Sequence, residues 1–407
     1  MRRLLTLGCL SYFIIGLAHV VGGAVLWQIM EKYGLSYKDG GQWLMNQFLG
    51  FLVGVLAAPY MTSKLGKRGG VLVALGVLTV SEAAYSLLPS WGLMLTIAPF
   101  AGFGFGMTEA VVGAMVIDMA ADDKKASSMS KLEIFFGVGA FIMPVTAGLL
   151  IKYDVWQLAF PILSALSGIT FVLWMTTSFG KIDDFISYQA PKAAGEATAG
   201  KQRGATGILG YKRSALPFLI LSALFFMVYV GMEMSFANYL PSLFIERSDM
   251  DLTGATAVLS LFWATMILGR LFAGQLADRI GYARYLLYAM VGAAVVFIFM
   301  AMIGQLSWML VMVGLSGLFL SGVFGIALVY ANKLIPGMTE RTTSLLVAFG
   351  GLGGAIFPRI TGWMMDRIGA DETMWMISLC IVTLLVLLLV MLVLGRGQSR
   401  REAVNND

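Results

Sequence analysis

The sequence predicts an all-α membrane protein with twelve transmembrane helices, arranged as two pseudo-symmetric bundles of six. Three observations lead to this fold class. The 407 residues are 58% hydrophobic and only 13% charged, the mean hydropathy is +0.82, and long apolar runs recur along the whole chain. This composition excludes a soluble globular protein of the same size.

Each apolar run is long enough to cross a bilayer as a helix, which takes roughly 20 residues. Backbone polar groups in lipid must bond within their own segment, and runs this long and continuous exclude a β-barrel. The first run lacks a cleavage site, so we expect it to be retained. The predicted spans are Leu4–Ile29, Trp43–Met61, Gly70–Leu88, Leu93–Met119, Met129–Ile151, Trp156–Met175, Leu216–Phe244, Gly254–Leu276, Tyr285–Ile303, Met309–Leu334, Thr342–Met365 and Thr373–Leu394.

A polar stretch rich in Ala, Gly and Lys separates the sixth span from the seventh and predicts a linker. The expected organisation is a first bundle over residues 1–175, a linker over 176–215, a second bundle over 216–395 and a tail over 396–407. The two halves also resemble each other in sequence. GVGAFIMPVTAG from Gly137 returns as GLGGAIFPRITG from Gly351, and Leu65-Gly66 returns as Ile280-Gly281 at nearly the same spacing. Parallel repeats of this kind place a binding site between the halves near the membrane midplane.

Basic residues predict the orientation, because Lys and Arg collect in cytoplasmic loops. Most of the 28 Lys and Arg residues fall on the side that holds both termini. We therefore expect both termini in the cytoplasm, and the positive net charge gives no reason to invoke nucleic acid. The exceptions are Lys32, Lys38, Lys152, Arg247, Arg359 and Arg367.

Two carboxylates interrupt the glycine-rich stretch between Gly102 and Pro144. A charge at membrane depth costs at least roughly 2.5–3.5 kcal/mol, so such residues usually face a cavity and mark a proton or substrate path. Glu109 shares a helical face with Gly106 and Gly113, which either leave room beside it or serve close helix packing. Glu133 either takes part in transport or helps to position the neighbouring charged loop.

Other polar residues within the spans are candidates for substrate binding. Glu233 is followed by Asn238 and Tyr239 near the helix break expected at Pro241. Arg359 is an unusual intramembrane cation that suits a carboxylate or an anionic substrate. We expect Glu82 to reach the lipid headgroups without a role and Arg270 to extend to the interface. Cys9 and Cys380, the two cysteines, predict neither a disulfide nor a metal site, and no cofactor is expected.

The turn G-Q-L-A-D-R-I-G after the eighth span resembles the signature turn of the major facilitator superfamily. The resemblance implies that Asp278 and Arg279, between Gly274 and Gly281, form a conformational latch with neighbouring helix ends. Charges of these signs suit helix macrodipoles. The matching N-terminal turn carries Ser63 in place of the aspartate, so the C-terminal turn should dominate the latch.

Four further stretches resemble bacterial proton-coupled sugar symporters of the glucose/mannose and fucose permease kind. They are NQFLGFLVGVLAAP, GFGFGMTEAVVGA, MSKLEIFFGVGA and EMSFANYLPS. The resemblance implies a monomeric transporter of the bacterial cytoplasmic membrane, in which Glu109 carries the proton and Glu133 binds sugar or takes part in coupling. It also implies that Gln47, Glu233 and Asn238 face the sugar.

The first span departs from the fucose permease, which has an essential carboxylate where this chain has Gly22-Gly23. The single histidine, His19, either replaces that carboxylate, since imidazole titrates near neutral pH, or is a hydrogen-bonded packing residue. Trp263 either stacks on an apolar sugar face or serves packing.

The sequence therefore favours proton-coupled symport of a small polar solute, with a sugar expected. Proton-antiport export of amphiphiles is the alternative, because 27 methionines and many phenylalanines would adapt to varied apolar ligands. A receptor without transport also remains open. No nucleophile and base pair, metal-spaced cluster or phosphate-binding loop supports an enzyme.

Overall fold

The computed structural model describes residues 2–119, 125–180, 183–186, 211, 215–248, 250–335 and 338–406. Most of the linker expected over 176–215 lies outside these residues. Eleven helical stretches of the described residues are long and apolar enough to cross a membrane. One of them, 50 residues long, holds two predicted spans, and another, Leu306–Leu334, comprises two consecutive helices. The twelve predicted spans are thus confirmed. The elements are α1 (Arg2–Ala24), α2 (Leu26–Tyr33), α3 (Tyr37–Ser86), α4 (Trp91–Met119), α5 (Lys125–Lys152), η2 (Trp156–Leu158), α6 (Ala159–Thr176), α7 (Asp183–Ile186), α8 (Leu216–Ser248), α9 (Leu252–Ile280), α10 (Tyr282–Met302), α11 (Leu306–Leu320), α12 (Val323–Leu334), α13 (Thr339–Arg367) and α14 (Ala370–Asn406).

The long helix α3 changes direction at Gly66, which separates its two spans. Gly66 has φ 73° and ψ 166°, a backbone conformation that only glycine adopts readily. In the second half Gly281 stands between α9 and α10 with φ 90° and ψ 140°. The repeated Leu65-Gly66 and Ile280-Gly281 pairs therefore form similar turns. In both copies the glycine lets one span end and the next begin without a loop.

Glycines at equivalent positions of the repeat also bring equivalent helices together. In the first half, α1 and α5 touch backbone to backbone at Gly16 and Gly139, where an added methyl group would overlap main-chain oxygens. In the second half, α8 and α13 approach in the same way at Gly231 and Gly353. Small residues let membrane helices pack closely, since lipid offers little hydrophobic drive for association. The two halves are thus pseudo-symmetric six-helix bundles, as predicted.

Replacing Gly353 by alanine is expected to destabilise the protein by roughly 1–3 kcal/mol, because the methyl group would overlap the backbone oxygen of Met227. The matched control is Gly325→Ala, since nothing lies within 4 Å of a methyl group there. Thermal unfolding in detergent measures both variants. We expect a clear fall in Tm for Gly353→Ala alone, and equal Tm values would refute this account of the contact.

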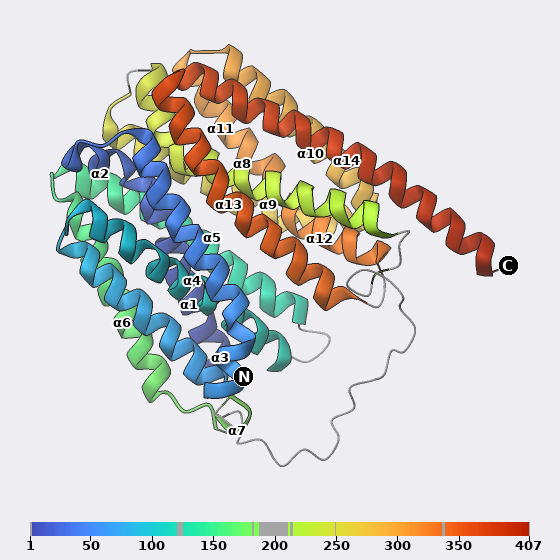
Figure 1. The fold of residues 1–407 in the computed structure, drawn as a ribbon, viewed down its shortest axis with the longest axis horizontal. Helices are drawn as coiled ribbons and strands as arrows, with labels where there is room; N and C mark the ends of the chain where they lie inside the picture. Colours follow the sequence, from blue (N-terminus) through green and yellow to red (C-terminus); the bar gives the residue numbers. More distant parts are fainter. Residues whose placement is uncertain are drawn as a thin grey trace.

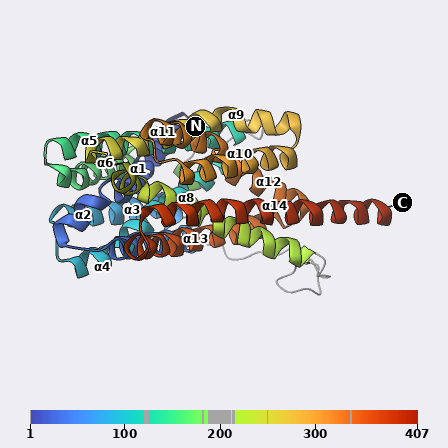
Figure 2. The ribbon, with the colours of Figure 1, turned by 90° about the horizontal axis from the view of Figure 1, so that it is seen from above.

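The two halves lie side by side, with the blue to green helices in one group and the yellow to red helices in the other (Figure 1). We call the end that holds Arg2, Gly66, Asp183 and Gly281 the linker end, and the end that holds Tyr37, Glu246 and Asp366 the far end. Seen from above, α14 runs across the second half, between α10 and α13 in this view, and projects past its neighbours toward the C-terminus (Figure 2).

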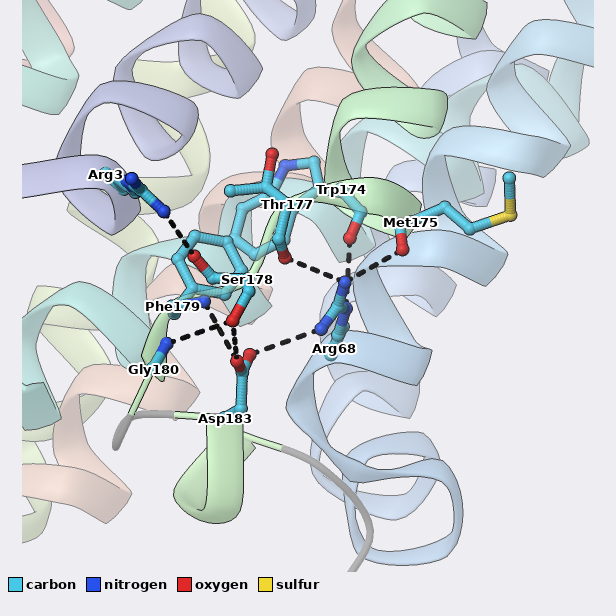
Figure 3. Close-up of polar contacts among 9 residues, drawn as sticks. All are labelled: Arg3, Arg68, Trp174, Met175, Thr177, Ser178, Phe179, Gly180 and Asp183. Carbon is cyan, nitrogen blue, oxygen red and sulfur yellow. Dashed lines mark hydrogen bonds and ion pairs between the residues drawn. The ribbon is translucent and has the colours of Figure 1, made fainter.

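At the linker end, Arg68 holds the end of α6 (Figure 3). Its guanidinium donates to the backbone oxygens of Trp174 at 3.0 Å, Met175 at 2.9 Å and Thr177 at 2.9 Å. It also pairs with Asp183 at 3.2 Å. The last carbonyls of a helix have no intrahelical donor, so a cation placed there satisfies them and suits the helix dipole. Arg68 therefore fixes the chain just after the sixth span.

Asp183 forms hydrogen bonds with the segment that follows α6. Its carboxylate accepts from the Ser178 hydroxyl at 2.8 Å and from the Phe179 N–H at 2.9 Å. The Ser178 hydroxyl is the largest cause that holds the pKa of Asp183 below its ordinary value of 3.8, followed by the Phe179 N–H and the charge of Arg68. Because the folded-state pKa is lowered, the ionised carboxylate stabilises this segment at every pH above the ordinary pKa.

Acid is expected to release residues 178–180 and 183–186, with the loss beginning below pH 3.8 and continuing through the lower folded-state pKa of Asp183. In Asp183→Asn, which is neutral at every pH, protection should already be low at pH 7. Hydrogen exchange protection factors for this segment between pH 7 and pH 3 test the prediction. Equal protection in wild type and variant at pH 7 would contradict it.

Candidate functional site

Helices α3 and α8, from different halves, both contact α1 at the adjacent glycines Gly22 and Gly23. A methyl group on Gly23 would lie 2.8 Å from the Cα of Asn238 on α8, and one on Gly22 would lie 3.4 Å from Oε1 of Gln47 on α3. Gln47 and Asn238 are 3% and 4% exposed. The Asn238 amide donates to the backbone oxygen of Met234 at 2.8 Å. The structure thus brings together two predicted sugar ligands from opposite halves.

The charge of one arginine acts on all three predicted carboxylates. Arg270 on α9 pairs with Glu133 on α5, with 3.6 Å between Nη1 and Oε2. Its charge also acts on Glu109 of α4 and on Glu233 of α8. Four helices from both halves therefore contribute to a single charged cluster, which we call the carboxylate cluster: Glu109, Glu133, Glu233 and Arg270.

The members of this cluster differ in their hydrogen bonds. The Glu233 carboxylate accepts from the Tyr229 hydroxyl at 3.4 Å, and that hydroxyl also donates to the Leu320 backbone oxygen at 2.8 Å. The Glu109 carboxylate has no hydrogen bond or ion pair with any described residue, although its backbone oxygen accepts from the Tyr12 hydroxyl at 3.0 Å. Glu109 is therefore the only carboxylate of the cluster that has neither a hydrogen bond nor an ion pair among the described residues.

Packing accounts for the two glycines beside Glu109. A methyl group on Gly106 would lie 2.9 Å from the Cα of Phe51, and one on Gly113 would lie 2.6 Å from the Tyr12 hydroxyl. Both glycines thus let α4 approach its neighbours α3 and α1. Of the two interpretations that the sequence left open for them, the contacts support helix packing.

His19 lies in a box of phenylalanine rings between the halves. Its ring centroid is 5.2 Å from that of Phe48 and 5.5 Å from those of Phe105 and Phe136, all in edge-to-face arrangements. Its Nε2 lies 3.1 Å from the sulfur of Met234 on α8. His19 is thus a contact between the halves, and the charge of Arg270 also acts on it.

Several polar atoms on the helices between the halves are buried without a hydrogen-bond partner among the described residues. Buried polar groups are normally satisfied, so each exception has a cost and points to a function or a ligand. These atoms are Nδ1 of His19, both amide atoms of Gln28, Oγ of Ser235, Nε1 of Trp263 and Nη1 of Arg359. Sequence reasoning missed Gln28 and Ser235, because an amide and a hydroxyl within a span carry no charge signal.

Two predicted ligands have a structural contact of their own. The Tyr239 hydroxyl donates to the backbone oxygen of Tyr37 at 3.0 Å, so it already joins the halves at the far end. Trp263 is 2% exposed, and its ring centroid is 6.2 Å from that of Phe136 across the interface. The indole thus packs on the wall of the histidine box.

The two charged residues of the predicted latch, Asp278 and Arg279, form no hydrogen bond or ion pair among the described residues with the end of a helix other than α10, the next along the chain. Asp278 accepts from the Tyr282 hydroxyl at 3.1 Å, four residues further along the chain. No hydrogen bond or ion pair joins Arg279 to another described residue. Nothing lies within 4 Å of a methyl group on Gly274 or Gly281. With no such bond to another helix end among the described residues, the latch stays a prediction.

Two expectations about charged residues are wrong. Glu82 does not reach the headgroups: it is 0% exposed, and both its oxygens lack a hydrogen-bond partner among the described residues. Arg270 does not extend to the interface but faces Glu133. Roughly 16 Å of helix separates Arg270 from Gly281 at the end of α9. This distance from the helix end was the sequence signal that Arg270 lies too deep to reach the interface. The partner on α5 could not be inferred, since it comes from the other half.

The profile of the Major Facilitator Superfamily matches residues 8–358. The chain belongs to this superfamily. This superfamily member is 29% identical over 362 residues to the glucose/mannose transporter GlcP of Bacillus subtilis (strain 168), a match that covers 88% of this chain and 87% of GlcP. The resemblance inferred from the motifs is thereby confirmed, and the chain is a transporter, not an enzyme.

Solved structures share the fold of this superfamily member at low identity. A D-xylose-proton symporter superposes with a TM-score of 0.76 at 11% identity, covering 95% of this chain and 96% of that one. FucP, a superfamily transporter solved in the outward conformation, gives a TM-score of 0.63 at 17% identity over 95% and 98% of the two chains. These likenesses establish a multi-pass transporter fold.

Proposed function

We propose that this transporter carries a small polar solute together with protons, and we expect the solute to be a hexose. The observation that carries the proposal is the site between the halves, where His19 and Trp263, each with an unpartnered ring nitrogen, contact Phe136 on the helix that carries Glu133. Hydroxyl-rich solutes satisfy buried amide, hydroxyl and indole groups. The similarity to a glucose/mannose transporter supports the same choice.

The chemistry of the site suits exchange of both ligands between the two sides. Gln47 and Asn238 lie on different halves, so one solute molecule held by both amides would bias the equilibrium between open and closed states. Glu109 has no competing partner among the described residues, so it is the proposed proton carrier. The charge of Glu133 acts on Glu109, and the charge of Arg270 acts on both Glu109 and Glu233.

The same proposal includes features that concern the chain as a whole. We propose bundles over 1–175 and 216–395, a linker over 176–215 and a tail over 396–407. We further propose that the protein is a monomer in a bacterial cell membrane with both termini on the cytoplasmic side. The basic residues near the linker end support this orientation.

Proton-antiport export of amphiphiles is a second candidate, and one observation favours it. Phe48, Phe51, Phe105 and Phe136 surround His19, and Met234 completes the box. Aromatic faces and a polarisable thioether suit a lipophilic cation. The unpartnered polar atoms on the same helices favour a polar solute instead.

The deciding experiment is uptake of labelled glucose and mannose into proteoliposomes, with and without an imposed proton gradient. We expect saturable accumulation above the equilibrium level only when the gradient is present. A lipophilic cation is tested in parallel as substrate. Cation flux against the proton gradient without hexose flux would replace symport by export, and binding without any flux would indicate a receptor.

A further inference from the structure

A groove on the surface of the second half lies between α9, α10 and α11. Its volume is about 370 Å³, and the large side chains that line it include Phe272 and Leu276 on α9, Tyr288 on α10 and Leu318 and Phe319 on α11. Phe272, Tyr288 and Leu318 are 64%, 62% and 42% exposed, so the groove opens on the surface of the bundle. All three helices belong to membrane-spanning stretches, and the groove therefore faces lipid.

The interior of this groove is apolar. The small residues Ala273 and Ala289 also line it, and their side chains are too short to fill the space. Its two buried polar side chains, Tyr285 and Ser321, form a hydrogen bond with one another, and the Ser321 hydroxyl donates to the Leu318 backbone oxygen at 2.7 Å. Polar groups that are already paired within the protein leave little for a polar ligand to bind. The groove is therefore suited to an apolar guest.

The groove has the length of a lipid chain. It extends from Gly269 to Ile280 along α9, which is roughly 16 Å of helix. Half of the hydrocarbon core of a bilayer is about 15 Å thick. An extended acyl chain of one leaflet thus matches the groove in length, with its headgroup at the linker end beside Gly281.

Two arginines lie at the linker end of the groove, on two of its helices. Arg279 follows Leu276 by three residues on α9, and Arg284 precedes Tyr288 by four residues on α10. Residues three or four apart share a helical face, so each arginine lies one turn beyond a side chain that lines the groove. Both arginines are exposed, and neither has a hydrogen bond or an ion pair with another described residue. Both guanidinium groups are therefore available to a ligand.

The charge around these arginines is positive. Lys333 adds a third cation, with its Nζ atom 5.8 Å from the ring centroid of Tyr282 at the start of α10. Asp278, the acid of the same turn, already accepts from the Tyr282 hydroxyl at 3.1 Å. A guanidinium matches the geometry of a phosphate group. This arrangement favours an anionic headgroup and disfavours a lipophilic cation.

We propose that the groove is a binding site for an anionic phospholipid, with one acyl chain between α9, α10 and α11 and the headgroup phosphate held by Arg279 and Arg284. Acidic lipids collect in the cytoplasmic leaflet and attract basic residues there, in agreement with the orientation proposed for the linker end. The site is separate from the carboxylate cluster and does not depend on which solute is transported.

Native mass spectrometry of the full-length protein in detergent tests the site. The protein is titrated with phosphatidylglycerol and with phosphatidylcholine of the same chain length, and a Kd is obtained for the first bound lipid. Arg279→Gln combined with Arg284→Gln removes both guanidinium groups and leaves the lining of the groove unchanged. The matched control, Lys64→Gln with Arg341→Gln, removes two exposed cations at the same end of the molecule, on α3 and α13. Each variant is first checked for an unchanged Tm.

We expect wild type to bind phosphatidylglycerol at least about tenfold more tightly than phosphatidylcholine, since two basic residues near the membrane surface each attract an acidic lipid. The double arginine variant should lose this preference, and the control variant should keep it. Ala289→Phe fills the groove and should weaken phosphatidylglycerol binding by a similar factor, although both arginines remain. Ala289→Leu takes its place if the larger ring lowers the Tm.

An unchanged preference for phosphatidylglycerol in the double arginine variant would overturn the site, and so would full affinity in the groove-filling variant. Equal Kd values for the two lipids in wild type would mean nonselective contact with surrounding lipid only. Displacement of phosphatidylglycerol by tetraphenylphosphonium would reject the lipid and mark the groove as a site for amphiphilic cations. Conversely, a preference that depends on the arginines in a protein that moves no hexose would leave this site standing and reject only the substrate.

Discussion

Glu109→Gln is expected to lower proton-driven accumulation of the solute by at least about tenfold, to the level of liposomes without protein. A gradient can drive a conformational cycle only through a proton that binds the two states differently. Glutamine keeps the shape of the protonated acid but cannot release a proton, so exchange of solute between equal proton concentrations should persist. Uptake and counterflow in the same liposome preparation measure both properties.

Glu82→Gln is the matched control for this prediction. Glu82 is also a buried carboxyl group without a partner among the described residues, but the described residue on which its charge acts is Tyr85, outside the carboxylate cluster. An ionised carboxylate would be very costly there, so glutamine replaces it with little change, and accumulation should match wild type. Accumulation that survives in Glu109→Gln would remove Glu109 as the proton carrier and favour Glu133 or Glu233.

The sequence predicted the fold well because a bilayer leaves few choices. Length and apolar composition set the spans, and the repeated glycines at Gly66 and Gly281 marked the same turn in both halves. The differences include breaks within predicted spans: the separate helix α2 follows Val25, whose φ of −115° and ψ of 12° interrupt the first span, and α11 and α12 divide the tenth. Local hydrophobicity does not encode such a break.

The charged residues of the site were found, but not their partners. Glu109, Glu133 and Glu233 are visible because a carboxylate within an apolar run is unusual. Their common neighbour Arg270 was assigned to the interface, since snorkelling is the usual behaviour of an arginine in a span. Which residue faces which across the two halves depends on tertiary packing, and spacing along one helix does not contain that information.

At the far end, the two halves are joined by a helix cap. Asp366 at the end of α13 accepts the backbone N–H groups of Tyr37 and Lys38, both at 2.8 Å, in the first turn of α3. The Tyr37 hydroxyl donates to Glu246 on α8 at 2.9 Å. A carboxylate at a helix N-terminus satisfies free N–H groups and suits the dipole. These bonds must break whenever the far end opens.

Asp366→Ala is therefore expected to shift the equilibrium toward a far-end-open state by roughly tenfold, since two charge-assisted hydrogen bonds, discounted for exposure, are lost only from the closed state. Spin labels at exposed Glu31 and Glu372, replaced by cysteine in the background without Cys9 and Cys380, measure the population of the longer distance.

Asp371→Ala is the matched control for Asp366→Ala. Asp371 is also an exposed far-end aspartate with a close partner, Arg247 at 2.7 Å, but both belong to the second half. Breaking that pair costs the open and closed states alike, so the distance populations should stay at their wild-type values. Equal shifts in the two variants would mean that surface charge alone sets the equilibrium. An unchanged distribution in Asp366→Ala would mean that apolar packing along α3 and α13 closes the far end without the cap.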